Sequence, residues 1–123
     1  MLRTEIRRAI TIIIAITAMV MISSCEKYTF RPPEVDPDYA WSLKDDIQPV
    51  FNSSCISCHG GSIAPDLRAG NSYNALTKGS YVTLPAEESR LYKTIISPGH
   101  TPRTTEAEKL KILYWITQGA KNN

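Results

Sequence analysis

The most constraining feature of this 123-residue chain is a pair of cysteines, Cys55 and Cys58, followed directly by His59. Two thiols three positions apart lie on the same side of a helical turn. The histidine that adjoins them is then held at a fixed place relative to both sulfurs. Cys-x-x-Cys-His is the attachment pattern of a c-type haem, in which each thiol adds across one vinyl group and the imidazole ligates the iron. The motif therefore predicts one covalent haem c, held by Cys55, Cys58 and His59.

The same residues are compatible with three other kinds of site. A thioredoxin-like redox pair also uses Cys-x-x-Cys, but it stands in a βαβ context, and the sequence shows no alternation of strands and helices. A zinc site normally takes four ligands, and the available set is Cys55, Cys58, His59 and His100. Three of those ligands fall within five residues, which is awkward for one metal ion. A disulfide between the two cysteines is the third alternative.

The amino-terminal residues indicate export. Arg3, Arg7 and Arg8 precede an apolar run of 14 residues, 9–22. That length suits the hydrophobic region of a signal peptide and falls short of the roughly 20 residues that span a bilayer as a helix. The run ends in an aliphatic residue, two serines and Cys25, a pattern that resembles the lipobox of bacterial lipoproteins.

The lipobox resemblance implies that residues 1–24 are removed and that Cys25 is lipidated and becomes the new amino terminus. Two or more acyl chains anchor a protein stably to a membrane. The alternative is an ordinary signal peptide that leaves Cys25 as a free thiol. A c-type haem is normally attached outside the cytoplasmic membrane, so the export signal and the haem motif support each other. We expect an extracytoplasmic protein, anchored by lipid to a bacterial membrane, at the periplasmic face or in the outer membrane.

Composition bounds the mature chain. Without residues 1–24 it has 99 residues, in which 11 Lys and Arg balance 11 Asp and Glu. This neutrality gives no reason to expect a nucleic-acid partner. Residues 25–40 are polar and rich in proline, which predicts a semi-extended tether. An arm that packs on the domain through Tyr28 and Phe30 is the alternative, and residues 41–123 form the predicted domain.

Within the domain, apolar periodicity predicts only helices. They cover residues 42–52, 72–77, 87–97 and 106–118. Ser42 with Asp45, and Thr105 with Glu108, are capping-box signals for the first and the last of them. Pro49 predicts a kink or an end within the first helix. The order is therefore helix, haem motif, loops, helix, turn-rich loop and helix, which is an all-α class.

The expected core-facing side chains follow the same periodicity. They are Leu43, Ile47, Val50 and Phe51, then Leu91, Tyr92, Ile95 and Ile96, then Leu110, Leu113, Tyr114 and Thr117, with Trp115 and Ile116 widening the last face. A domain of this size buries a limited fraction of its surface. We therefore expect a bound haem to act as part of the core and the haem-free chain to be poorly folded.

With these elements in place, the chain resembles a small class I cytochrome c of the kind found as single-haem bacterial lipoproteins. The matching segments are Ile47-Gln48-Pro49-Val50-Phe51, Cys55-Ile56-Ser57-Cys58-His59-Gly60, Ser89-Arg90-Leu91-Tyr92 and Trp115-Ile116-Thr117-Gln118-Gly119-Ala120. The resemblance covers roughly residues 41–123. It implies an all-α domain of three to four helices packed around one covalently bound haem, with the first and last helices crossing near the haem edge.

The chain departs from that family at the second iron ligand. The family usually supplies a methionine, commonly followed by proline, in the loop before the last helix. Here a threonine stands between His100 and Pro102, and all three methionines lie in the predicted signal peptide. We expect His100 to ligate the iron opposite His59. The alternatives are a solvent-exposed His100 with a five-coordinate iron, or an iron bound by water or lysine.

These features predict electron transfer with redox partner proteins. A histidine pair should give a lower potential than a Met/His pair, which raises it. Lys44, Lys78, Arg90 and Lys93 are candidates for a rim that docks an acidic partner, and scattered surface charges are the commoner alternative. The alternative function is a haem-based binding or sensing module with an open distal site for a small ligand. No enzyme is expected, because the sequence offers no second haem motif and no distal acid–base constellation.

Overall fold

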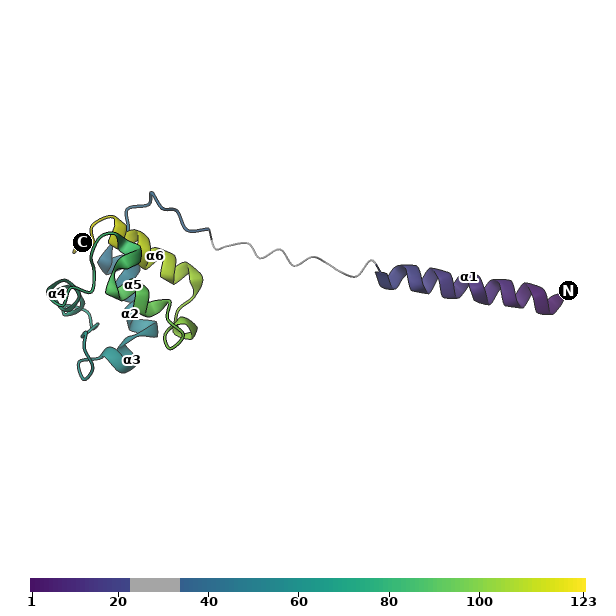
Figure 1. The fold of residues 1–123 in the computed structure, drawn as a ribbon, viewed down its shortest axis with the longest axis horizontal. Helices are drawn as coiled ribbons and strands as arrows, with labels where there is room; N and C mark the ends of the chain where they lie inside the picture. The colour runs from purple at the N-terminus through teal and green to yellow at the C-terminus, as the bar shows by residue number, and fades with distance from the viewer. Residues whose placement is uncertain (23–33) are drawn as a thin grey trace. The chain divides into compact units, whose positions relative to one another are not determined.

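The structure is a computed structural model that describes residues 1–22, with side chains up to residue 16, and residues 34–123. Cys25, Tyr28 and Phe30 lie outside the described residues, so the predicted lipid attachment and the packed arm are not tested. The chain divides into two units, Met1–Arg31 and Pro32–Asn123, each described by itself. The first contains one helix, α1 (Leu2–Ile22) (Figure 1). Within the described residues, no helix combines the length and apolarity that a membrane crossing requires.

The second unit is built from helices, and its described residues contain no strand. Its elements are the π-helical turn η1 (Leu43–Ile47), α2 (Gln48–Ser54), α3 (Ile56–His59), α4 (Ser72–Lys78), the 3-10 turn η2 (Ala86–Glu88), α5 (Arg90–Ile95), the 3-10 turn η3 (Thr101–Arg103) and α6 (Glu106–Thr117) (Figure 1). The all-α prediction is confirmed for the described part of the chain.

The first predicted helix is present, but its hydrogen-bonding pattern changes from π-helical to α-helical along the segment. Ser42 begins η1, and its Oγ accepts a hydrogen bond from the Asp45 amide at 3.2 Å. The reciprocal bond comes from Asp46, whose carboxylate accepts from the Ser42 amide at 2.9 Å, one residue later than predicted. Pro49 has no N–H to continue an α-helical ladder. The segment therefore passes from the π-helical turn to α2 at Gln48, where the kink was predicted, and continues to Ser54.

The prediction of one continuous helix over residues 87–97 is wrong. Ser89 has extended backbone angles, φ −61° and ψ 143°, and separates η2 from α5. Its side chain is fully buried, and its Oγ accepts from the Tyr92 amide at 3.3 Å. Ser89 thus caps α5 instead of lying inside a helix. In the shortened helix only Leu91 and Ile95 are buried, whereas Ile96 is 47% exposed.

The last helix begins as predicted but presents a different face. Thr105 and Glu108 form both bonds of the capping box, which confirms the predicted start. The buried side chains of α6 are Lys109, Ile112, Trp115 and Ile116. Of the predicted face, Trp115 and Ile116 are buried as expected. Leu110, Leu113 and Tyr114 are half-buried and Thr117 is exposed, so the predicted centre of the face is wrong. The charge on the buried side is paired, because the Lys109 ammonium donates to the Glu106 carboxylate at 2.6 Å.

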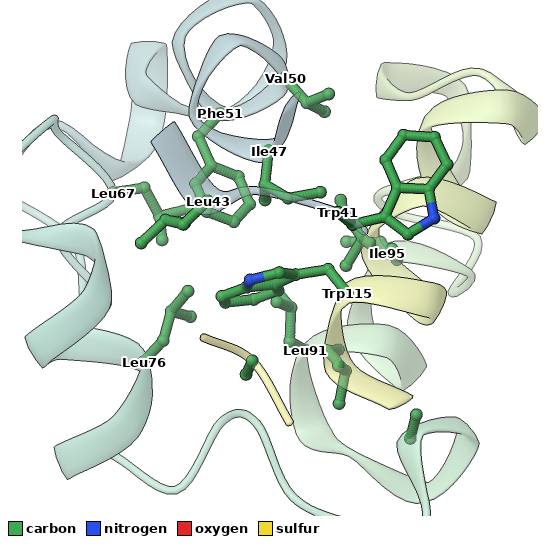
Figure 2. Close-up of a cluster of buried hydrophobic side chains, with 14 residues drawn as sticks. Trp41, Leu43, Ile47, Val50, Phe51, Leu67, Leu76, Leu91, Ile95 and Trp115 are labelled. Carbon is green, nitrogen blue, oxygen red and sulfur yellow. The ribbon is translucent and has the colours of Figure 1, made fainter. Parts of the chain in front are cut away.

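One apolar cluster holds the helices together. It is composed of Trp41, Leu43, Ile47, Val50, Phe51, Leu67, Leu76, Ala86, Leu91, Ile95, Ile112, Trp115, Ile116 and Ala120. Figure 2 shows the indole of Trp115 near the middle of these side chains. α6 contacts η1, η2 and α5 around it. Burial of each large apolar side chain stabilises the fold by roughly 1.5–3 kcal/mol. Because α2 and α5 both contribute side chains to this cluster, it holds the two helices in position.

The last residues of the predicted tether contact the end of α6. Gln118 donates from Nε2 to the carbonyl oxygens of Pro37, at 3.1 Å, and Tyr39, at 2.8 Å. Its Oε1 accepts from the Trp41 amide at 3.0 Å. One glutamine side chain therefore fixes the entry of the chain into the domain.

Candidate haem-binding site

The two cysteines and the histidine lie on a short helical turn that continues α2. The Cys55 amide donates to the Phe51 carbonyl at 2.9 Å, and the His59 amide donates to the Cys55 carbonyl at 2.9 Å. α3 is therefore joined to α2 through hydrogen bonds on both sides of Cys55. Cys55 is half-buried and Cys58 is exposed, and both are free thiols. Cys55 and Cys58 therefore do not form a disulfide bond in this structure.

Both predicted iron ligands border one cavity with both cysteines. The cavity has a volume of about 370 Å³ and is lined by Ser54, Cys55, Cys58, His59, Ile63, Ile95, Gly99, His100, Arg103 and Thr104. A smaller cavity of about 60 Å³ shares four of its lining residues, namely Cys55, His59, Ile95 and His100. The larger volume falls in the range of small-molecule and cofactor sites. Residues 45 positions apart in the chain are thereby brought to one apolar space.

Two other hollows of similar volume, about 390 and 410 Å³, lie elsewhere on the domain. Neither is lined by a histidine or a cysteine. Volume alone does not distinguish the three hollows, whereas the side chains that line them do. Of these three hollows, the cavity beside α3 is the one lined by cysteine and histidine side chains.

Burial keeps the Cys55 thiol neutral. It raises the pKa of Cys55 from 9.0 to about 11, the Glu108 carboxylate adds to this rise, and the Arg103 guanidinium opposes it. A protonated thiol is a poor redox nucleophile, because that role needs the thiolate. A thioether carries no charge, so the same burial costs an alkylated Cys55 nothing.

One side-chain nitrogen of His59 lacks a hydrogen-bond partner. Its Nδ1 is buried, and no hydrogen-bond partner lies within reach among the described residues. A buried polar atom left in this state costs roughly 1–3 kcal/mol. Its backbone, in contrast, is fixed, because the His59 carbonyl accepts from the Leu67 amide at 2.9 Å. An imidazole on a fixed backbone, beside two thiols and an apolar cavity, fits a haem as its bound group.

A buried polar network fixes the loop behind the motif to α2. The Gln48 Nε2 donates to the Leu67 carbonyl at 2.9 Å, and the Gln48 Oε1 accepts from the Ser72 hydroxyl at 2.6 Å. On the outer side, the Arg68 guanidinium donates twice to the Asp66 carboxylate, at 2.9 and 2.7 Å. This pair holds the pKa of Asp66 well below its usual range. The loop that carries the His59 backbone bond is therefore held from both sides.

The turn at Gly60 requires glycine. A Cβ added there would lie 2.7 Å from the Ile56 carbonyl oxygen. Real Cβ atoms do not approach a backbone oxygen so closely, so a larger residue would displace the end of α3. Gly60 thus allows the chain to turn directly after the motif.

His100 reaches the cavity from the turn that follows α5. Its amide donates to the Ser97 carbonyl at 3.0 Å, and its Nδ1 lies 3.4 Å from the Ser97 Oγ. The ring is half-buried and also borders the smaller cavity. η3 follows immediately and leads to Thr105, where α6 begins.

The zinc and thioredoxin-like alternatives find no support in this geometry. Across residues 1–22 and 34–123, no three His, Cys, Asp or Glu side chains gather closely enough to hold a metal ion together. The same residues contain no strand, so they offer no βαβ unit around the cysteine pair. A haem iron needs fewer ligands from the protein than a zinc ion does, because the porphyrin supplies four of them and the protein adds one or two.

The predicted basic rim does not lie at the cavity. None of Lys44, Lys78, Arg90 and Lys93 lines it. Arg90 lies 4.5 Å from the centre of the Tyr81 ring, and Lys93 pairs with Glu88. The basic residue that does line the cavity is Arg103, which the sequence reasoning missed. Its neighbour Thr104 has a buried hydroxyl with no partner among the described residues.

Comparison of the chain with protein-family models, with curated proteins and with solved structures found no match. The function proposed below therefore depends on the residues of this site and their chemistry.

Proposed function

We propose that this chain is a mono-haem c-type cytochrome that transfers electrons outside the cytoplasm. The observation that carries the proposal is that Cys55, Cys58, His59 and His100 all border one apolar cavity. When bound, haem c supplies a one-electron ferric/ferrous couple. The all-helical domain is then a small cytochrome c-like fold, in which the helices pack beside the porphyrin.

Each site residue has a distinct role in this proposal. Cys55 and Cys58 hold the porphyrin as thioethers, and α3 sets the spacing of their sulfurs. His59 ligates the iron from a fixed backbone, because its amide and its carbonyl are both hydrogen-bonded. His100 ligates the iron as the second histidine. Histidine pairs favour the ferric state more than a methionine and histidine do, so the potential is low for a class I cytochrome.

The cavity edge offers a small contact surface for redox partner proteins. Cys58 is exposed there, and Ile63 is 55% exposed. Arg103 adds a positive charge at the same edge. Redox encounters use small, weak interfaces, so an apolar edge with one cation suffices for an acidic partner. The near-neutral charge of the mature chain gives no reason to add a nucleic-acid partner.

The cellular address in this proposal comes from the sequence. Residues 1–24 act as a lipoprotein signal peptide, Cys25 carries the lipid, and the following residues tether the domain to a bacterial membrane. An anchored cytochrome of this kind exchanges electrons with partners at the periplasmic face or in the outer membrane. No catalytic role is proposed.

Spectroscopy and mass measurement together test the proposal. The full chain is produced in a bacterial host that attaches c-type haem, beside a Cys55→Ala/Cys58→Ala variant. We expect a red protein whose mass equals the lipidated mature chain plus one haem, and a variant without covalent haem. A colourless wild-type protein with the mass of the bare lipidated chain would falsify the assignment.

A second function, ligand sensing, is favoured by one observation. His100 lies on a turn next to Gly99 and Pro98, and the hydrogen bond of its side chain to the Ser97 Oγ is long, at 3.4 Å. A ligand that leaves the iron would open a distal site for a diatomic gas. Carbon monoxide added to the reduced protein separates the two functions. Slow, incomplete binding supports electron transfer, whereas rapid and complete binding supports a sensor.

A further inference from the structure

We infer that Ser97 is a positioning residue for the second iron ligand, because its hydroxyl fixes the tautomer of His100 and leaves Nε2 free to bind the metal. This inference rests on the proposed function, since it assigns a role toward the iron. It concerns a residue that neither the haem motif nor the ligand positions single out.

The direction of the hydrogen bonds follows from counting protons. A serine hydroxyl has one proton to donate and two lone pairs. The Ser97 Oγ lies 2.6 Å from the Thr94 carbonyl oxygen, which can only accept, so the proton of Ser97 points there. Toward the His100 Nδ1, 3.4 Å away, Ser97 then has only lone pairs to offer. The Nδ1 must therefore carry the proton and donate it to Ser97.

The tautomer decides which nitrogen can ligate. A neutral imidazole has one N–H and one lone pair, and a metal takes the lone pair. With the proton on Nδ1, the lone pair is on Nε2, at the far end of the ring. Ligating histidines commonly donate their other N–H to an oxygen in this way, which orients the ring and increases its basicity.

The backbone of the same serine keeps the ring within reach. The Ser97 carbonyl accepts from the His100 amide at 3.0 Å and from the Thr101 amide at 2.8 Å. Residues 97–101 therefore close into one turn, in which the hydroxyl and the imidazole belong to the same hydrogen-bonded unit. His59 has no such oxygen, because its Nδ1 is without a partner among the described residues. The two histidines should consequently differ in how strongly they donate to iron.

The test compares the wild-type haem protein with Ser97→Ala and Ser97→Thr. Loss of an outer-shell partner commonly costs 10- to 100-fold in metal binding. A tenfold loss in the preference of ferric over ferrous iron for His100 equals a rise of about 59 mV in the one-electron midpoint potential. We expect Ser97→Ala to show at least this rise, with carbon monoxide binding to the reduced protein about tenfold faster. Ser97→Thr keeps a hydroxyl and should stay near the wild type.

Ser53→Ala is the matched control. Ser53 makes the same kind of bond to the carbonyl three residues earlier, from Oγ to Val50 at 3.1 Å, without contacting a histidine. The inference is overturned if Ser97→Ala keeps the wild-type potential and carbon monoxide rate, if Ser97→Thr behaves like Ser97→Ala, or if Ser53→Ala shifts the potential equally.

Two further measurements keep the outcomes distinct. His100→Ala should turn the low-spin iron high-spin, and an unchanged spectrum would remove His100 from the site and end the proposed ligand pair itself. If Ser97→Ala does not accumulate, nuclear magnetic resonance of the reduced wild type decides. The Nδ1 proton of His100 should then resonate further downfield than that of His59, and equal shifts for the two protons overturn the inference.

Discussion

The Gln48 side chain is predicted to stabilise the domain more than any exposed polar side chain in it. Gln48 is 7% exposed and joins α2 to the loop that follows the haem motif. The Gln48→Ala substitution removes the donor for the Leu67 carbonyl and the acceptor for the Ser72 hydroxyl, two bonds in a buried setting. Its third bond is donated to the side chain of Asn52. Asn52 is exposed, so water can replace Gln48 as its hydrogen-bond partner.

The magnitude follows from the two buried groups that lose their partner. Each costs roughly 1–3 kcal/mol when it is left unsatisfied, which places Gln48→Ala at about 2–6 kcal/mol. A domain of this size has a free energy of unfolding of roughly 5–15 kcal/mol. Since about 1 kcal/mol shifts the melting temperature of a small domain by about 4–8 °C, a fall of at least about 8 °C is expected.

The assay is urea and thermal unfolding of the haem-loaded protein, followed by far-ultraviolet circular dichroism. Asn52→Ala is the control, because it removes only the exposed side of the same network and should stay within about 0.5 kcal/mol of the wild type. A Gln48→Ala protein within about 1 kcal/mol of the wild type, or an Asn52→Ala protein destabilised equally, would refute the reasoning from buried partners.

Three other predictions concern local features of the fold. Thr105→Ala removes the first half of the capping box of α6 and should cost about 0.5–2 kcal/mol in chemical unfolding. Gly60→Ala should lower the melting temperature, because the added Cβ meets the Ile56 carbonyl oxygen, whereas Gly99→Ala meets nothing within 4 Å and should not. The folded-state pKa of Asp66 is depressed by Arg68, so the pair stabilises the fold above the usual pKa of 3.8 and this contribution is lost as the pH falls. Asp66→Asn should therefore lose less stability than the wild type between about pH 5 and about pH 3, as thermal melts at both values would show.

Local signals predicted the starts of the helices well. Ser42 and Thr105 begin their segments because a side-chain oxygen can satisfy a free amide at a helix start, whatever the rest of the fold does. No comparable sequence signal predicted a helix start at Ser89, since a serine between two acidic residues and an apolar run is compatible with a helix interior. Its extended backbone and complete burial come from packing against distant residues, which local propensity does not contain.

The face of α6 was mispredicted for a related reason. Apolar side chains occupy nearly every position from Leu110 to Ile116, so periodicity alone does not say which stripe is buried. Trp115 decides it, because the largest side chain takes the centre of the cluster and its Nε1 donates to the Lys121 carbonyl at 3.0 Å. Burial of the indole rotates Ile112 and Ile116 inward with it.

The residues of the candidate site also divide into those that local sequence predicts and those that only packing brings there. Cys55, Cys58 and His59 are close in sequence, so their spacing alone predicts that they act together. His100 was expected in the site only from its place in the loop, and its position beside the same cavity depends on α5 and α6 packing together. Arg103 gave no pattern to recognise, because a basic residue after a proline is common in surface turns.

The two sides of the cavity are built differently, and this difference separates stability from redox tuning. His59 stands on a turn that is hydrogen-bonded to α2 and backed by the Gln48 network, so changes there should act on the free energy of unfolding. His100 stands on a turn closed by Ser97, where one hydroxyl determines the donor strength of the ring. Gln48→Ala should therefore cost more stability than Ser97→Ala, which loses two half-buried bonds worth about 1 kcal/mol each, yet move the midpoint potential less. If Gln48→Ala shifted the potential as far as Ser97→Ala, both ligands would have to move with the whole domain, and neither turn would tune the iron independently.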